Sequence, residues 1–235
     1  MGVFVSVIIL ILVALIFCFL QITPGVFTQF YHYSLGRFTK NRTDDLSLDF
    51  ILGVETFSTI IWFAVYTIVF MILYYNQNQI NSLLFWILAS ICIIEALFVL
   101  IFYFKKGHST ATFIPRSASK AFLTDIKKVK SRKDAFAIGF LSAIPELIIT
   151  LPLYIMTTII LANSVILYPA LIIILLIIVP TIQLFIIRLC YRSGHNLASI
   201  QRFRTKTKLF LRLFLSLCFL ELSAVMIYLG VLYNG

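Results

Sequence analysis

Six long apolar stretches dominate the pattern of hydrophobic and polar positions along this chain. Each is longer than the roughly 20 residues that a helix needs to cross about 30 Å of hydrocarbon. The short strands of alternating polarity that a membrane β-barrel requires do not occur in the sequence. The pattern therefore predicts an all-α polytopic membrane protein with six transmembrane helices. We expect these helices at Val3–Phe30, Leu48–Tyr75, Leu83–Phe104, Ala135–Ala162, Val165–Cys190 and Leu209–Leu232.

Composition and charge agree with a membrane location. Of the 235 residues, 61% are hydrophobic and only 12% are charged. All 19 Lys and Arg residues lie in or beside the segments 31–47, 105–134 and 191–208, whereas the loops at 76–81 and 163–164 carry none. The positive-inside rule makes these basic segments cytoplasmic loops of a plasma or inner membrane protein, with both termini outside. The basic excess then attracts anionic lipid, and no nucleic-acid partner is expected.

The longest basic loop is expected to contain a helix of its own. Within Ser117–Lys130, Phe122, Ile126 and Val129 fall on one helical face and the lysines fall largely on the other. Such a helix lies in the lipid headgroup region, and a plain solvated linker is the alternative. The chain is thus expected to form a single transmembrane domain, residues 1–235, whose halves at about 1–104 and 134–235 are joined by an amphipathic connector at about 105–133.

A repeat relates the two halves. The segment Ser90–Glu95 has the pattern Ser-x-Cys-x-x-Glu, and so does Ser216–Glu221. Three helices in each half reverse the direction of entry into the membrane, so the sequence predicts a 3+3 inverted repeat, as in many transporters. A rival repeat matches Gly107–Thr112 with Gly194–Ser199 and implies parallel helix hairpins instead.

Four glutamates lie well inside the predicted spans: Glu55, Glu95, Glu146 and Glu221. A carboxyl group in hydrocarbon is unfavourable unless it is neutralised, paired or hydrated, so these residues are candidates for an ion or substrate pathway. Glu95 and Glu221 are expected near the membrane midplane, where they would bind a cation or a proton. The alternative is that these carboxyls only link helices by hydrogen bonds.

Two predicted helices combine polar residues with helix breakers. Ser142, Glu146 and Thr150 recur every four residues and form one polar stripe. Pro24 and Pro145 occupy matching positions in the two halves, in Ile22-Thr23-Pro24 and Ala143-Ile144-Pro145. Broken helices in matching positions indicate a central binding site whose freed carbonyls are ligands, although an ordinary proline kink is the alternative.

Several chemistries have no support in the sequence. No nucleotide-binding loop, metal-spaced Cys and His cluster or nucleophile–base pair occurs. The four cysteines all lie inside predicted spans, and no two of them have CxxC spacing. We therefore expect neither an enzyme, nor a metal site, nor a cofactor.

Two short motifs resemble those of small six-helix inverted-repeat exporters. Thr23-Pro24-Gly25 resembles the threonine-proline-glycine turn of lysine exporters, and Asp134-Ala-Phe-Ala137 resembles a motif of the manganese-exporter type. Gly25 and Glu146 follow the prolines where the thiol-transferring type of the same group has cysteines, which disfavours thiol transfer. The resemblance implies a six-helix inverted-repeat exporter.

The sequence thus favours a secondary transporter or exporter of a small cation or amine-bearing solute, proton-coupled through the intramembrane glutamates. An interior rich in carboxylates and free of bases attracts cations. The alternative is a non-catalytic membrane scaffold or a subunit of a larger membrane complex. Both hypotheses leave open a homo-oligomer or a membrane partner.

Overall fold

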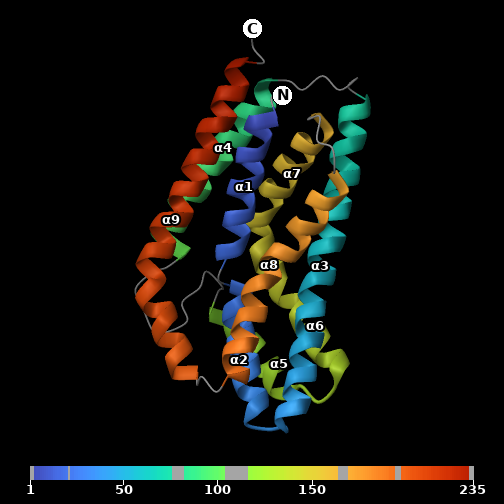
Figure 1. Cartoon of the computed structure of the whole chain (residues 1–235), viewed down its shortest axis with the longest axis vertical. Coiled ribbons are helices and arrows are strands. Elements are labelled where there is room, and N and C mark those ends of the chain that lie inside the picture. The colour runs from blue at the N-terminus through green and yellow to red at the C-terminus, as the bar shows by residue number, and fades with distance from the viewer. Residues whose placement is uncertain are drawn as a thin grey trace.

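The chain folds into a bundle of long helices that run roughly along one direction (Figure 1). A computed structural model describes residues 3–20, 22–75, 82–103, 116–163, 169–193 and 197–232, and every regular element in these ranges is helical. The start of the first helix and the end of the last lie at the same end of the bundle, and helix α5 lies at the opposite end.

The helices follow one another along the chain with two internal breaks. They are α1 (Val3–Phe19), α2 (Ile22–Leu35), α3 (Lys40–Tyr75), α4 (Ser82–Phe98) with a π-helical turn (Val99–Tyr103), α5 (Arg116–Lys128), α6 (Arg132–Ala143) with a 3-10 turn (Ile144–Glu146), α7 (Leu147–Asn163), α8 (Pro169–Arg192) and α9 (Leu197–Leu232). The predicted spans at 3–30 and 135–162 therefore each consist of two helices.

Five helical stretches are long and apolar enough to cross a membrane, among the described residues. Large apolar side chains also cover the outside of the bundle; Phe63, for example, is 66% exposed, and Ile68 and Phe70 are exposed beside it on α3. An apolar surface of this extent is stable only in contact with lipid or another protein. The chain is an all-helical integral membrane protein.

Two helices begin earlier than the apolar pattern predicts. Helix α3 begins at Lys40 rather than Leu48, and α9 begins at Leu197 rather than Leu209. Hydropathy marks only the part of a helix that contacts lipid, whereas backbone hydrogen bonding continues into the polar region. The predicted loops 31–47 and 191–208 are therefore largely helical. The Gly-His pairs of the rival repeat, at 107–108 and 194–195, lie outside the described residues.

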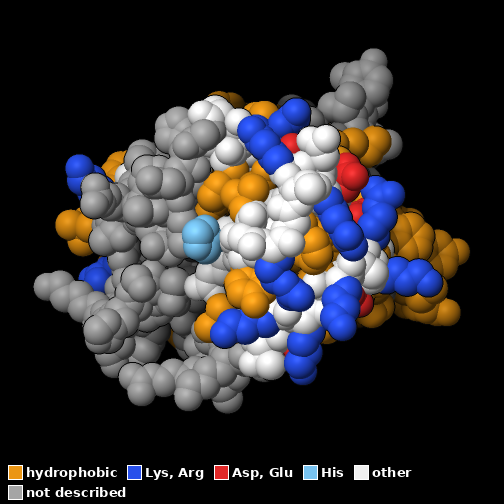
Figure 2. Space-filling model, turned by 90° about the horizontal axis from the view of Figure 1, so that it is seen from below, with side chains coloured by type: hydrophobic (Ala, Val, Ile, Leu, Met, Phe, Trp, Pro, Cys, Tyr) orange, Lys and Arg blue, Asp and Glu red, His pale blue; other side chains and the backbone are white. Residues whose placement is uncertain are grey.

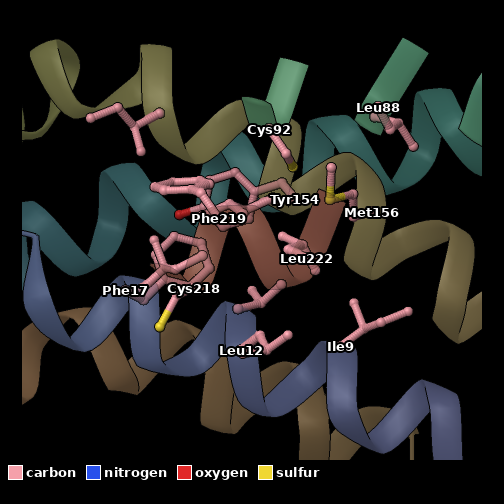
Figure 3. Close-up of a cluster of buried hydrophobic side chains, with 14 of the residues drawn as sticks. Ile9, Leu12, Phe17, Leu88, Cys92, Tyr154, Met156, Cys218, Phe219 and Leu222 are labelled. Carbon is pink, nitrogen blue, oxygen red and sulfur yellow. The ribbon is translucent and has the colours of Figure 1, made fainter. Parts of the chain in front are cut away.

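The larger of two apolar cores brings together helices from both halves of the chain. Figure 3 shows side chains of α1, α4, α7 and α9 pointing toward one another, among them Phe17, Tyr154 and Phe219. Phe17 and Tyr154 have ring centroids 5.2 Å apart. Since Phe17 belongs to the first half and Tyr154 to the second, this core holds the halves together.

Helices α3 and α6 approach each other very closely where they cross. A Cβ atom on Gly53 would lie 2.1 Å from the carbonyl oxygen of Phe136, and one on Gly139 would lie 2.0 Å from that of Phe50. Both distances are far below van der Waals contact. Glycine at both positions lets the two backbones touch, as at other small-residue crossings of membrane helices.

The connector forms α5, and its apolar face packs on the protein. Ile126 and Val129 are buried in the second apolar core, with Phe122 partly buried against it. Lys127 and Lys128, in contrast, are exposed. The helix predicted within Ser117–Lys130 is therefore present, and its apolar face contacts α2 and α6.

Candidate functional site

The first helix break lies between α1 and α2. Helix α1 ends at Phe19, and α2 begins at Ile22, so Pro24 occupies the first turn of the new helix. A proline is well accommodated there, because the N–H groups of a first turn have no partner within the helix. The break thus precedes Pro24 and presents the free N–H groups of Ile22 and Thr23.

The second break is the 3-10 turn at Ile144–Glu146, between α6 and α7. Pro145 lies in its first turn. Without an N–H, Pro145 cannot continue the α-helical hydrogen bonds of α6, and the N–H of Ile144 bonds instead to the carbonyl of Leu141. Pro152, in contrast, lies inside the continuous helix α7.

The two breaks meet through the carboxyl group of Glu146. Its Oε1 accepts hydrogen bonds from the backbone N–H groups of Ile22 and Thr23, both at 2.9 Å. Its Oε2 accepts a bond from the hydroxyl of Thr23 at 2.9 Å. This hydroxyl also lies 3.2 Å from the carbonyl oxygen of Ser142, which the second break frees. Glu146 is buried, and it caps the positive end of α2.

Further polar groups surround this break centre, which we define as Ile22, Thr23, Ser142 and Glu146. Thr150, one turn beyond Glu146, is buried. The hydroxyl of Ser142 bonds to the carbonyl of Gly139 at 2.7 Å. The phenol of Tyr154 interacts with the hydroxyl of Ser58 on α3. The predicted stripe of Ser142, Glu146 and Thr150 therefore lies inside the bundle.

Glu95 has a very different environment on α4. It is only 7% exposed, and its Oε2 has no hydrogen-bond partner among the described residues. The π-helical turn Val99–Tyr103 begins one turn further along, and such turns are frequent at functional sites. Just after Glu95, the carbonyl of Ala96 accepts a bond from the hydroxyl of Ser216 on α9 at 3.1 Å.

The other two glutamates lie closer to the outside of the bundle. Glu55 is partly buried on α3, and its carboxyl interacts with the hydroxyl of Thr181 on α8. Glu221 is exposed on α9. Among the described residues, no hydrogen bond or electrostatic interaction joins two of the four glutamates. The carboxyls therefore occupy four separate environments.

A polar network that the sequence did not reveal links α2, α3 and α8. The hydroxyl of Tyr31 donates to the carboxylate of Asp44, which forms an ion pair with Arg192 at 3.3 Å. The ring of Tyr31 stacks on that of Tyr191 with centroids 4.5 Å apart. Nearby, Arg188 donates to the hydroxyl of Ser47 at 2.9 Å. The signal in the sequence was the pair of aspartates at 44 and 45, just before the apolar stretch that begins at Leu48.

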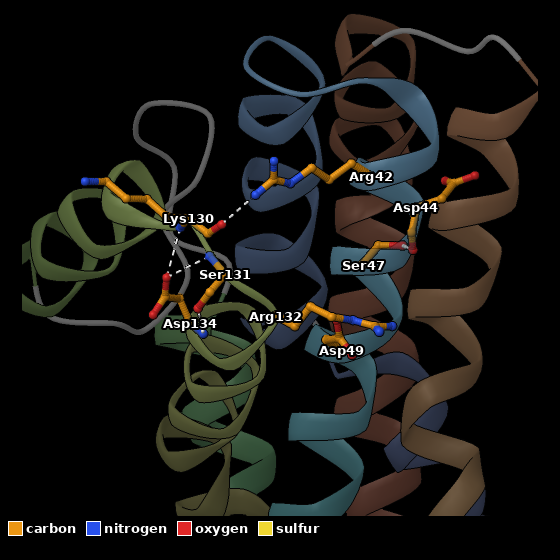
Figure 4. Close-up of polar contacts among 8 residues, drawn as sticks. All are labelled: Arg42, Asp44, Ser47, Asp49, Lys130, Ser131, Arg132 and Asp134. Carbon is orange, nitrogen blue, oxygen red and sulfur yellow. Dashed lines mark hydrogen bonds and ion pairs between the residues drawn. The ribbon is translucent and has the colours of Figure 1, made fainter.

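Positive side chains gather at the same end of the bundle. Figure 2, viewed from below, shows Lys and Arg side chains gathered around this face. Some of them link α3 to α6 and to the segment before it: Arg42 donates to the carbonyl of Lys130 at 2.9 Å, and Arg132 pairs with Asp49 at 2.8 Å (Figure 4). Among the described residues, no group of His, Cys, Asp and Glu side chains could hold a metal ion.

Comparison of the chain with models of known protein families, with curated proteins and with solved structures finds no match. The fold and the site define the class only as far as an integral helical membrane protein with a buried polar centre between two broken helices.

Proposed function

We propose that this protein is a secondary transporter that moves a small cation or amine-bearing solute by alternating access, coupled to protons through a membrane carboxyl. One observation carries the proposal: two broken helices meet at their breaks, in the interior of an apolar bundle. Non-helical backbone at membrane depth is tolerated where protein or a water-filled cavity covers it. Transporters use such paired breaks at their central site.

The proposal includes six membrane crossings. Helix α8 supplies the sixth, because its 24 residues span about 36 Å at 1.5 Å per residue, more than the hydrocarbon thickness. The basic end would then face the cytoplasm, with both termini outside and anionic lipid around the basic loops.

The packing of the helices supports an inverted repeat. In a 3+3 scheme, the broken helix α1–α2 corresponds to α6–α7, α3 to α8, and α4 to α9. Helix α6 packs on α3, and its counterpart α1 packs on the counterpart α8. Helix α4 packs along α9, and in this scheme α9 is the counterpart of α4. Parallel hairpin repeats would not pair the elements in this way.

Within this scheme, the two buried carboxyls have different roles. Both carboxyl oxygens of Glu146 accept hydrogen bonds from α2, so this residue links the two breaks. Glu95 has a buried oxygen without a partner among the described residues, so it is the candidate for binding a proton or a cation. A bound proton or cation would offset the cost of burying this carboxyl unpaired.

Flux in proteoliposomes tests the proposal. Protons, monovalent and divalent cations and basic amino acids would be offered in turn to the wild type, to Glu95→Gln and to Asp125→Asn. Asp125 is exposed on α5 and serves as the matched control for loss of a carboxyl. Solute-dependent flux that Glu95→Gln abolishes and Asp125→Asn retains supports the transporter. No flux from folded protein across the whole panel contradicts it.

One observation favours a second candidate, a scaffold or subunit of a larger membrane complex. Glu221 is exposed on the outside of α9, with Leu217 and Leu220 exposed beside it. A carboxyl facing lipid is unfavourable, and a partner helix with a polar side chain would relieve it. A stoichiometric partner retained in mild detergent by the wild type and lost in Glu221→Leu supports this role.

A further inference from the structure

The repeat makes α4 and α9 directly comparable, since positions 126 residues apart share the Ser-x-Cys-x-x-Glu pattern. The two helices pack along each other, and their directions are opposite. Ala96 lies opposite Ser216, and Trp86 lies opposite Gly230. Positions near 93 on α4 therefore face positions near 219 on α9, which is the arrangement that a two-fold axis between the repeats requires.

Much of the buried surface of the two helices is equivalent. On α4 the buried residues Phe85, Ala89, Cys92 and Ala96 form one face. The residues 126 positions later, Leu211, Leu215, Cys218 and Leu222, are also buried. Cys92 and Cys218 both lie in the apolar core in Figure 3.

The polar residues at the edges of these faces break the equivalence. On α4, Glu95 is buried and Ser90 is exposed, with its hydroxyl bonded to Trp86 of its own helix at 2.9 Å. On α9 the order is reversed, because Ser216 is buried against Ala96 and Glu221 is exposed. The buried face of α4 thus extends toward its glutamate, and that of α9 extends toward its serine. Rotation of each helix about its own axis interconverts these arrangements.

We propose that this structure is one of two related states, and that in the other state α4 and α9 exchange environments, so that Glu221 becomes buried and Glu95 exposed. The proposal rests on the inverted repeat of the proposed function and extends it by naming the two carboxyls that alternate. In the second state the contact between Ser216 and Ala96 is lost. The contact that is equivalent under the two-fold axis forms instead, and in it the hydroxyl of Ser90 donates to the carbonyl of Leu222.

Dicyclohexylcarbodiimide tests the exchange, because this apolar reagent modifies carboxyl groups that are accessible from hydrocarbon. The protein in lipid nanodiscs would be labelled, and the modified peptides quantified by mass spectrometry. Wild-type protein is expected to be modified at Glu221 rapidly and at Glu95 about ten-fold or more slowly, through the second state. Modification of Glu221 without any modification of Glu95 overturns the proposal, and so does the absence of modification at Glu221.

Disulfide cross-links test which contact controls the labelling. Ala96→Cys with Ser216→Cys joins the contact seen here and is expected to abolish labelling of Glu95 while Glu221 stays reactive. Ser90→Cys with Leu222→Cys joins the equivalent contact and is expected to reverse this pattern. Variants with only one of the two introduced cysteines, and reduction of each disulfide, are the controls. Labelling of Glu95 that the first cross-link leaves unchanged overturns the proposal.

The two proposals can fail separately. Labelling of both Glu95 and Glu221 that follows the cross-links, without flux of any solute, would support the two states and contradict the transporter. Flux without this exchange of labelling would support the transporter and contradict the alternation of Glu95 and Glu221.

Discussion

The break centre around Glu146 and the α4–α9 pair around Glu95 each contain a buried carboxyl group, but the hydrogen bonding of the two carboxyls differs. The two oxygens of Glu146 together accept bonds from two backbone N–H groups and one hydroxyl. One oxygen of Glu95 has no hydrogen-bond partner among the described residues. Within the same ranges, Arg212 on α9 has a buried Nε without a partner. Each helix of the α4–α9 pair therefore contains an ionisable side chain with an unpaired buried atom, although Thr43 and Trp62 on α3 also have one each.

The helix contacts differ in the same sense. Helices α3 and α6 meet backbone to backbone at Gly53 and Gly139. Between α4 and α9, Gly230 instead faces the ring of Trp86, and the hydroxyl of Ser216 bonds to the carbonyl of Ala96. Tight backbone contacts resist sliding and rotation, whereas side chains adjust by changing rotamers. We regard α2, α3 and α6 as a rigid frame, and α4 and α9 as a pair that can rotate.

Alanine at Gly139 is expected to have the largest effect on stability. Its methyl group would lie 2.0 Å from the carbonyl oxygen of Phe50, so α3 and α6 would have to separate by ~1 Å or more. We expect a loss of about 3 kcal/mol, or failure to fold. Thermal unfolding in detergent, followed by the fluorescence of Trp62 and Trp86, measures the loss.

Gly230→Ala is the matched control in the rotating pair. There the new methyl group would meet only the Trp86 side chain, at 3.1 Å, and that ring can move. We expect a loss of less than about 1 kcal/mol. Equal effects of the two substitutions would contradict the distinction between frame and pair.

Replacement of the two buried glutamates should give the next largest difference. Glu146→Leu removes the acceptor of the N–H groups of Ile22 and Thr23, whereas the Thr23 hydroxyl keeps the carbonyl of Ser142. Each buried unpaired group costs about 1–3 kcal/mol, so we expect a loss of about 2 kcal/mol or more, which Glu146→Gln reduces because it keeps one oxygen. Glu95→Leu is expected to leave stability unchanged or increase it. A large loss of stability in Glu95→Leu would show that this carboxyl is structural.

The sequence was sufficient for the class of fold but not for these differences. The apolar stretches correctly predicted an all-helical membrane protein. The prolines at 24 and 145 marked two helices that are broken, although the first break lies before Pro24 and frees N–H groups, whereas the carbonyl that bonds across the breaks is that of Ser142 at the second. Proline reveals where a helix can begin or end, but tertiary contacts decide which groups are then satisfied.

Glu95 and Glu221 show why the site was harder to predict. Their local sequences are nearly equivalent, so no pattern along the chain could assign burial to one and exposure to the other. The difference arises from the rotation of each helix against its neighbours, which is a property of the packed bundle. Gly53 and Gly139 were likewise uninformative until the two helices were seen to cross at them.

A smaller effect is expected from Asp44→Asn at the basic end of the frame. The substitution removes the charge that pairs with Arg192 and weakens the bond from Tyr31. Because Arg192 is largely exposed, we expect only about 1 kcal/mol, reduced further at high salt. Unfolding at low and high ionic strength measures it. Glu221 lies on the rotating pair and has no ion-pair partner in the part of the chain that the structure describes, so Glu221→Gln is the control and should not change stability.

The smallest effects should come from two serines whose hydroxyls each take part in one hydrogen bond. Ser131 caps the N-terminus of α6, where its hydroxyl accepts from the N–H of Asp134 and the Asp134 carboxylate accepts from the N–H of Ser131. Ser131→Ala should destabilise the frame by about 1 kcal/mol, as loss of other helix caps does. Ser216→Ala removes the bond to Ala96, which the second state does not contain. Ser216→Ala should therefore change stability less than Ser131→Ala does. It should nevertheless increase carbodiimide labelling of Glu95, which Ser131→Ala should leave unaltered. If the two serines had the same effect on both measurements, the frame and the pair would not be separate parts of the molecule.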